Sequence, residues 1–122
     1  MSIIHFSIND FITQLPAFAP VPAPIGEPVS QVRVRSESPA SAPTSRTGVW
    51  ECTQGRWQRQ IRQAEFCVFL EGRARFTPAD GGATLEIGTG EAVYFPANSL
   101  GEWEILEDSR KVYLIFEEGA AA

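Results

Sequence analysis

Short runs in which apolar and polar residues alternate dominate the chain from residue 31 onward. The segment SQVRVRS alternates strictly, which is typical of a half-buried strand with Val32 and Val34 facing inward. Runs rich in aromatic and β-branched residues follow at spacings of about 8–12 residues, separated by Gly, Pro, Asn and Asp. We predict strands in GVWECT, RWQRQIR, FCVFLEG, RARFTP, ATLEIG, EAVYFP, EWEILE and KVYLIF. Short antiparallel strands in this number predict an all-β sandwich or barrel.

Turn residues divide these runs. The segment PADGGA predicts a hairpin, because Asp80, Gly81 and Gly82 adopt positive φ angles at little cost. Further turns are predicted in GTG and in PANSLG, and the Ser/Pro/Ala-rich segment SESPASAPTSRTG predicts a loop.

The first thirty residues differ from the rest. Five prolines between residues 16 and 28 exclude a regular helix there and favour extended chain. The many apolar residues among them argue against a flexible tail, which is the alternative. We therefore predict an extended Pro-rich arm over residues 1–30, lying across the domain or a partner subunit. The barrel domain is expected over residues 31–117, with a tail at residues 118–122.

Composition and charge limit the class of protein and the partners that it can bind. At 122 residues, with 43% apolar and 20% charged residues, the chain reads as one globular domain. A net charge of −5 argues against nucleic acids and anionic membranes as partners, since both would be repelled. No apolar run approaches ~20 residues, so no membrane span is predicted. Two cysteines and no recognisable signal peptide predict free thiols in a cytoplasmic protein.

Two spaced motifs carry a resemblance. Glu65 is followed by six residues and Gly72, and Gly90 by five residues and Pro96, with Asn98 in the next turn. These segments resemble the double signature of the cupin superfamily, whose fold is a small RmlC-like jelly-roll β-barrel. The wider match runs over GVWECTQGRW, EFCVFLEGRARFTP, GEAVYFPANSLGEWEI and RKVYLIF, about residues 47–116. It is similar to small stand-alone cupins with an (S)-ureidoglycine aminohydrolase-type domain, and the resemblance implies a single cupin barrel.

The metal ligands of that family are missing here. Metal-binding cupins use two histidines one residue apart, a glutamate and a later histidine. With a four-residue gap before Glu65, the first two positions fall on Gln58 and Gln60. With a three-residue gap they fall on Arg59 and Ile61.

The later position falls on Gly101, and the chain's single histidine, His5, lies in the arm. Amide oxygens are weak ligands for transition metals. We therefore predict no metal and no other cofactor.

Strand alternation predicts a pocket instead. If Glu65 faces the interior as the resemblance implies, Cys67 shares its face. With the four-residue gap the glutamines also point inward, and Trp103 shares the face of Gly101. The predicted ligand pocket comprises Gln58, Gln60, Glu65, Cys67 and Trp103, with Tyr94 or Tyr113 at its edge.

Each candidate has an alternative role. Desolvation in an apolar barrel would raise the pKa of Glu65 and suit acid or base catalysis. Alternatively, Glu65 pairs with Arg62 or another arginine and does no chemistry. Cys67 has no histidine to activate it, which favours an inert thiol. Trp103 either stacks on a ligand or belongs to the core.

Three hypotheses follow. The first is a metal-free cupin that binds a small polar molecule, such as a carboxylate or an amide. The second is an enzyme acting on a ureido or amino-acid-like substrate, with Glu65 as acid or base. The third is a structural dimer with a filled barrel. A homodimer is expected from the resemblance and from Trp57 and Ile61, which the same parity places on an outer apolar surface.

Overall fold

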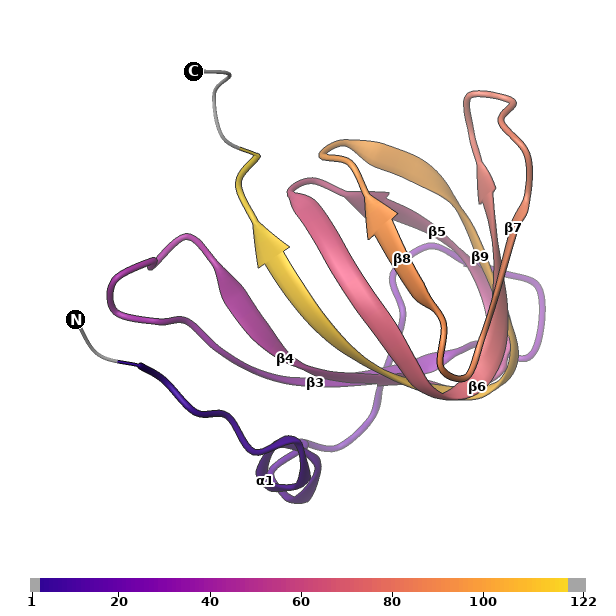
Figure 1. Ribbon diagram of the computed structural model, residues 1–122. Helices are drawn as coiled ribbons and strands as arrows, with labels where there is room; N and C mark the ends of the chain where they lie inside the picture. Colours follow the sequence, from indigo (N-terminus) through magenta and orange to yellow (C-terminus); the bar gives the residue numbers. More distant parts are fainter. Residues whose placement is uncertain (1–2, 119–122) are drawn as a thin grey trace.

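The computed structural model describes residues 3–118, which form a curled antiparallel β-sheet with a short helix beneath it (Figure 1). The elements in chain order are α1 (Ile8–Thr13), β1 (Ala19–Pro20), β2 (Pro24–Ile25), β3 (Gln31–Glu37), β4 (Arg46–Cys52), β5 (Gly55–Ile61), β6 (Ala64–Pro78), β7 (Leu85–Gly88), β8 (Ala92–Phe95) and β9 (Ser99–Phe116).

The long strands β6 and β9 connect two halves of the barrel. They pair with each other from Ala64↔Phe116 to Pro78↔Gly101. In one half, β8 lies beside β6, and β4 and then β3 lie beside β9. In the other half, β7 lies beside β6 and β5 beside β9. The two halves curl toward each other, which confirms the predicted all-β barrel.

The bend between the halves explains one of the two sequence motifs. The β6–β9 register shifts between Phe69 and Ala74, as expected for bulges that increase local curvature. Gly72 lies inside this region with φ +93°, and a Cβ atom there would lie 2.6 Å from the Asp108 carbonyl oxygen. Only glycine fits that backbone and that approach. The spacing from Glu65 to Gly72 therefore sets the distance from an inward carboxylate to the bend.

The predicted turns are present. Gly81 and Gly90 have φ angles of +87° and +84°, and Asn98 has +63°. The Gly82 amide donates to the Asp80 carboxylate at 2.9 Å, which closes the turn between β6 and β7. Asn98 thus supports the left-handed turn in which the cupin signature usually has glycine.

The core lies between the two halves and centres on Trp103, which is fully buried. Its ring centroid lies 5.1 Å from that of Phe76, 5.7 Å from Phe95 and 6.2 Å from Phe69. Tilted and edge-to-face arrangements of this kind are favourable for aromatic pairs. Trp103 is therefore a core residue.

The N-terminal arm lies across its own domain. Residues of β1 pair with β3, and Pro24 and Ile25 of β2 pair with Trp57 and Arg56 of β5. Val21 is 4% exposed and belongs to the core. The arm thus contacts both halves of the barrel of its own chain.

The arm also contains a helix, in a part for which the sequence analysis predicted extended chain. Ser7 caps α1 by accepting a hydrogen bond from the Asp10 amide, and Phe11 is buried against the sheet. The prediction of a wholly extended arm was wrong because the prolines begin only at Pro16, after α1 has ended.

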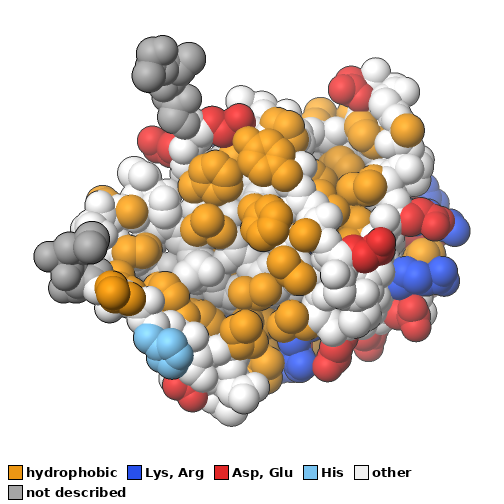
Figure 2. Space-filling model, in the orientation of Figure 1, with side chains coloured by type: hydrophobic (Ala, Val, Ile, Leu, Met, Phe, Trp, Pro, Cys, Tyr) orange, Lys and Arg blue, Asp and Glu red, His pale blue; other side chains and the backbone are white. Residues whose placement is uncertain are grey.

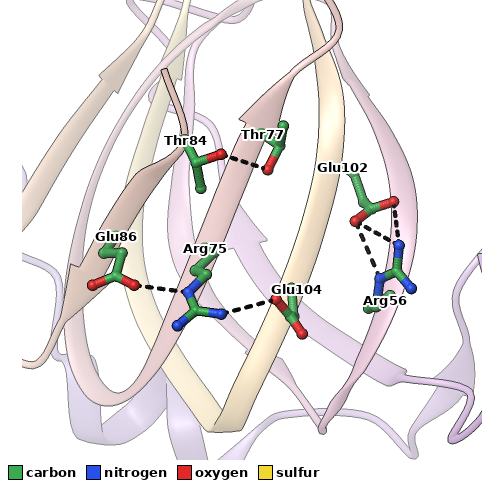
Figure 3. A network of polar contacts seen from close by, with 7 residues as sticks. All are labelled: Arg56, Arg75, Thr77, Thr84, Glu86, Glu102 and Glu104. Carbon is green, nitrogen blue, oxygen red and sulfur yellow. Dashed lines mark hydrogen bonds and ion pairs between the residues drawn. The ribbon is translucent and has the colours of Figure 1, made fainter. Parts of the chain in front are cut away.

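The outer faces of the two halves differ in polarity. Tyr94, Phe66 and Leu114 lie side by side on β8, β6 and β9, and each is 42–48% exposed. Figure 2 shows hydrophobic side chains gathered over this half of the sheet. On the other half, charged residues cover the outer face (Figure 3): Arg75 contacts Glu86 and Glu104, and Arg56 contacts Glu102.

Trp57 and Ile61 are buried, with 4% and 3% exposed, so they do not form the outer surface from which a homodimer was inferred. That argument was wrong, and the homodimer stays a prediction. Within residues 3–118, no helix has the length and apolarity needed to cross a membrane.

Candidate functional site

A buried ion pair occupies the interior beneath one end of the barrel. The Lys111 ammonium donates to the Glu65 carboxylate at 2.7 Å, and the two residues are 4% and 2% exposed. Glu65 pairs with Ile115 across the β6–β9 ladder, four residues beyond Lys111. The lysine side chain therefore runs along the inside of the barrel to reach the carboxylate.

Aromatic rings enclose the ammonium. The Lys111 Nζ atom lies 4.4 Å from the ring centroid of Trp50 and 5.5 Å from that of Trp103. Burying a lone charge is costly, and both the carboxylate and the ring faces reduce that cost. The sequence argument for Glu65 assumed a lone carboxylate in an apolar interior. The structure instead gives this carboxylate a cationic partner.

Lys111 was not identified as a site residue from the sequence, although the alternation in KVYLIF places its side chain on the inner face of the strand. Lys111, Tyr113 and Ile115 are buried, whereas Val112, Leu114 and Phe116 are more exposed. Arg62, the partner named for Glu65, is exposed. A salt bridge was among the predicted alternatives, but its partner is Lys111.

A small cavity opens above the ion pair. It comprises two hollows of about 130 and 170 Å³ that share Arg46, Arg59, Glu65 and Ile115 as lining residues. The first hollow also reaches Ser36, Trp50, Lys111 and Tyr113. We call the two together the mouth cavity. Each hollow alone is smaller than the ~300–1,000 Å³ typical of pockets for drug-sized ligands, and the two together only reach the lower end of that range.

Cationic groups outnumber anionic ones at the mouth cavity. Arg46, Arg59 and Lys111 line the first hollow and Arg62 lines the second, with Glu65 as the carboxylate. Among residues 3–118, neither Arg46 nor Arg59 has a carboxylate within ion-pair distance. Burial lowers the pKa of Arg59; Glu65 acts in the opposite direction, and Arg46 lowers the pKa further.

Tyr113 adds a hydroxyl group to the same wall. Burial raises its pKa, and its contacts with Ser36 and Arg46 oppose that shift. The phenol is therefore protonated at neutral pH and available as a hydrogen-bond donor. Of the two tyrosines considered for the pocket edge, Tyr113 is the one that lines the cavity.

The two predicted glutamines do not point into the barrel. Gln58 and Gln60 are exposed on β5, whereas Trp57, Arg59 and Ile61 alternate toward the interior. Gln60 nevertheless contributes to the lining of the second hollow. The predicted inward orientation of the two glutamines was wrong. The four-residue gap placed even-numbered residues of β5 inward, whereas the odd-numbered residues face the interior. Tyr94 is 48% exposed and its hydroxyl donates to Glu118 at 2.9 Å.

Cys67 and Trp103 do face the interior, on the predicted sides of β6 and β9, but both are buried below the cavity lining. Burial raises the pKa of Cys67, and likewise of Cys52, from 9.0 to about 11. A thiol with such a pKa is a poor nucleophile at neutral pH. Both cysteines are free, as predicted.

The residues present do not fit a metal ion of the cupin type. Glu65, the one remaining carboxylate ligand, is bonded to the Lys111 ammonium. At Gly101, where the later histidine would stand, a Cβ atom would lie 2.7 Å from the Phe76 ring. Within residues 3–118, no group of three or more His, Cys, Asp or Glu side chains is arranged to hold a metal.

Comparison with known proteins identifies the family. Residues 40–113 match the family model described as the EutQ-like cupin domain. No curated protein matches the chain significantly.

Solved structures share the fold. A protein of unknown function from Rhizobium leguminosarum bv. viciae 3841 superposes with a TM-score of 0.71 at 20% identity, over 97% of this chain and 100% of the other. The EutQ protein of Clostridium difficile gives 0.63 at 15% identity, over 72% and 69%. A DUF861 family protein from Thermotoga maritima gives 0.54 at 28% identity, over 68% and 99%.

Proposed function

Because the chain belongs to the EutQ-like cupin domain family, we propose that it binds a small polar metabolite in the mouth cavity without a metal ion. One observation carries the proposal: the Lys111 ammonium holds Glu65 at 2.7 Å directly beside the cavity. The carboxylate that serves as a metal ligand in other cupins is thus bonded to a cation of the protein. The charge is supplied by the chain itself.

The lining of the cavity supports a polar ligand. Guanidinium groups, a tyrosine hydroxyl and a serine hydroxyl face one small space, with Trp50 and Ile115 as apolar walls. Few convergent polar groups on an apolar frame are typical of ligand pockets. The volume favours a metabolite with a short carbon skeleton over a nucleotide or a cofactor.

A thermal-shift screen on metal-stripped protein tests this proposal. The panel contains small carboxylates, amides, ureas and sugars, and at least one class is expected to raise the melting temperature by mass action. The substitution Ser36→Leu should abolish the shift, since Ser36 lines the first hollow. Glu37→Leu is the matched control, because Glu37 is the next residue of β3 and points outward.

A different pattern would contradict the proposal. If only divalent metals stabilise the protein, and Glu65→Ala removes that effect, the site is a metal site. If shifts persist unchanged in Ser36→Leu, the ligand binds elsewhere.

A second candidate is an enzyme, for which the same ion pair gives one argument. A carboxylate and an ammonium in hydrogen-bond contact beside a cavity form an acid–base pair. The (S)-ureidoglycine aminohydrolase-type resemblance suggests a ureido or amino-acid-like substrate. Glu65→Gln should then abolish turnover of such substrates while the protein stays folded by circular dichroism. Turnover at the wild-type rate in this variant would refute an acid or base role for Glu65.

A further inference from the structure

We infer that the ligand of the mouth cavity is a small carboxylate anion held by the guanidinium groups of Arg46 and Arg59. This inference rests on the proposed function and specifies its ligand class. Arg46 lies on β4 opposite Ile115, and Arg59 lies on β5 opposite Gly101. The two arginines therefore reach one cavity from the two different halves of the barrel.

The arginines that line the mouth cavity differ from the other arginines in their pairing. Arg33, Arg56, Arg75 and Arg110 each contact a glutamate within 3.5 Å. In the described part of the chain, Arg46, Arg59 and Arg62 have no such partner, and all three line the mouth cavity, although the protein as a whole carries a net charge of −5. An acidic protein thus keeps unneutralised guanidinium groups at the mouth cavity.

The buried ion pair removes the main obstacle to an anion. An isolated Glu65 carboxylate would repel a negatively charged ligand in the cavity. The Lys111 ammonium offsets that charge at 2.7 Å, so the cavity lining keeps a net positive charge from its arginines. Arg59 is also partly desolvated, which strengthens its attraction for an anion.

Hydrogen-bonding capacity distinguishes a carboxylate from an amide. Arginine offers only donors, in a planar fork that matches the two oxygens of a carboxylate. The Tyr113 hydroxyl is protonated and adds another donor. An amide NH₂ group would face these donors with few free acceptors, because one Glu65 oxygen is already bonded to Lys111.

Calorimetric titration at low ionic strength tests the inference, since salt would screen the arginines. The probes are acetate, malonate and succinate, their neutral amides, and inorganic phosphate. At least one carboxylate is expected to bind about tenfold or more tightly than its amide. Arg46→Gln and Arg59→Gln should each weaken that carboxylate by about 10- to 100-fold, as expected for a lost charge-assisted hydrogen bond.

Two controls separate site chemistry from folding. Arg56→Gln removes an arginine from the outer face of the same strand, where it pairs with Glu102, and should leave carboxylate affinity unchanged. Arg59→Lys keeps the charge without the planar fork and should give an intermediate loss. Melting curves of all variants establish that each is folded at the titration temperature.

The outcomes distinguish this inference from the proposed function. Amides that bind as tightly as carboxylates, with no effect of Arg46→Gln or Arg59→Gln, would overturn the inference and leave metal-free small-molecule binding intact. Phosphate binding tighter than every carboxylate would overturn the ligand class. If no carboxylate, amide or phosphate binds and the metabolite screen is also negative, both proposals fail.

Discussion

The Glu65 carboxylate and the Lys111 ammonium lie 2.7 Å apart inside the barrel, although they are 46 positions apart in the sequence. Removing only one of them would leave an unpaired buried charge. We expect Lys111→Met to lower the free energy of unfolding by about 3–5 kcal/mol. The double variant Glu65→Leu/Lys111→Met should recover most of that loss. Urea denaturation measures all three proteins, and equal losses in the single and double variants would contradict the pairing.

Glycine is required at Gly72 for two separate reasons, positive φ and close approach to Asp108 and Ser109. Gly72→Ala is therefore expected to destabilise the protein by more than about 3 kcal/mol. Gly81 is the matched control, because it has φ +87° with nothing within 4 Å of a built Cβ. Gly81→Ala should cost only about 1 kcal/mol, by urea denaturation. Similar losses at both positions would mean that the bend tolerates a side chain.

The buried thiols should make the protein sensitive to alkaline pH. Cys52 and Cys67 have their pKa raised from 9.0 to about 11 in the folded state. The unfolded state then loses protons first as the pH rises above 9, so the free energy of unfolding falls between pH 9 and 11. Each thiol contributes a slope of about 1.4 kcal/mol per pH unit.

Urea denaturation at several pH values measures this slope, and Cys52→Ala and Cys67→Ala should each reduce it. An unchanged slope in both variants would assign the alkaline sensitivity to other groups. Native protein should also react slowly with iodoacetamide at pH 8, and unfolded protein rapidly.

Metal analysis of tag-free protein checks the ligand set directly. After dialysis against Mn²⁺, Fe²⁺, Ni²⁺ or Zn²⁺, we expect no near-stoichiometric metal, because Glu65 is engaged by Lys111 and the histidine positions are filled by other residues. Glu71→Ala is the control, because Glu71 is an exposed acidic residue. The expectation is refuted if the protein binds metal, loses it in Glu65→Ala and keeps it in Glu71→Ala.

The sequence supported the fold better than the site. Membership of the cupin superfamily followed from the Glu65–Gly72 and Gly90–Pro96 spacings and is confirmed by the family match. These motifs encode backbone requirements, such as the positive φ of Gly72 and the turn at Asn98, which hold without the metal chemistry. The ureidoglycine aminohydrolase-type function stays a proposal.

The errors at the site have a common cause. The prediction of which β5 residues face the interior was taken from the four-residue gap before Glu65. The burial of Trp57 and Ile61 shows that the opposite set of residues faces the interior. Trp57 and Ile61 each lie two residues from Arg59, so alternation places all three on one face of the strand. Two large apolar residues on that face indicate that it points to the core. Lys111 was harder to predict, because a lysine among apolar residues usually faces solvent, and its partner is distant in the sequence.

The N-terminal arm has a consequence for the order of folding during synthesis. The arm emerges from the ribosome before the barrel, yet β2 requires β5, and β5 is held in the sheet by β9, the last strand of the domain. We therefore expect Val21, a core residue of the arm, to stay exposed to solvent until β9 has been translated. The arm is thus made before the strands that it needs, which lengthens the period in which a chaperone has apolar chain to bind.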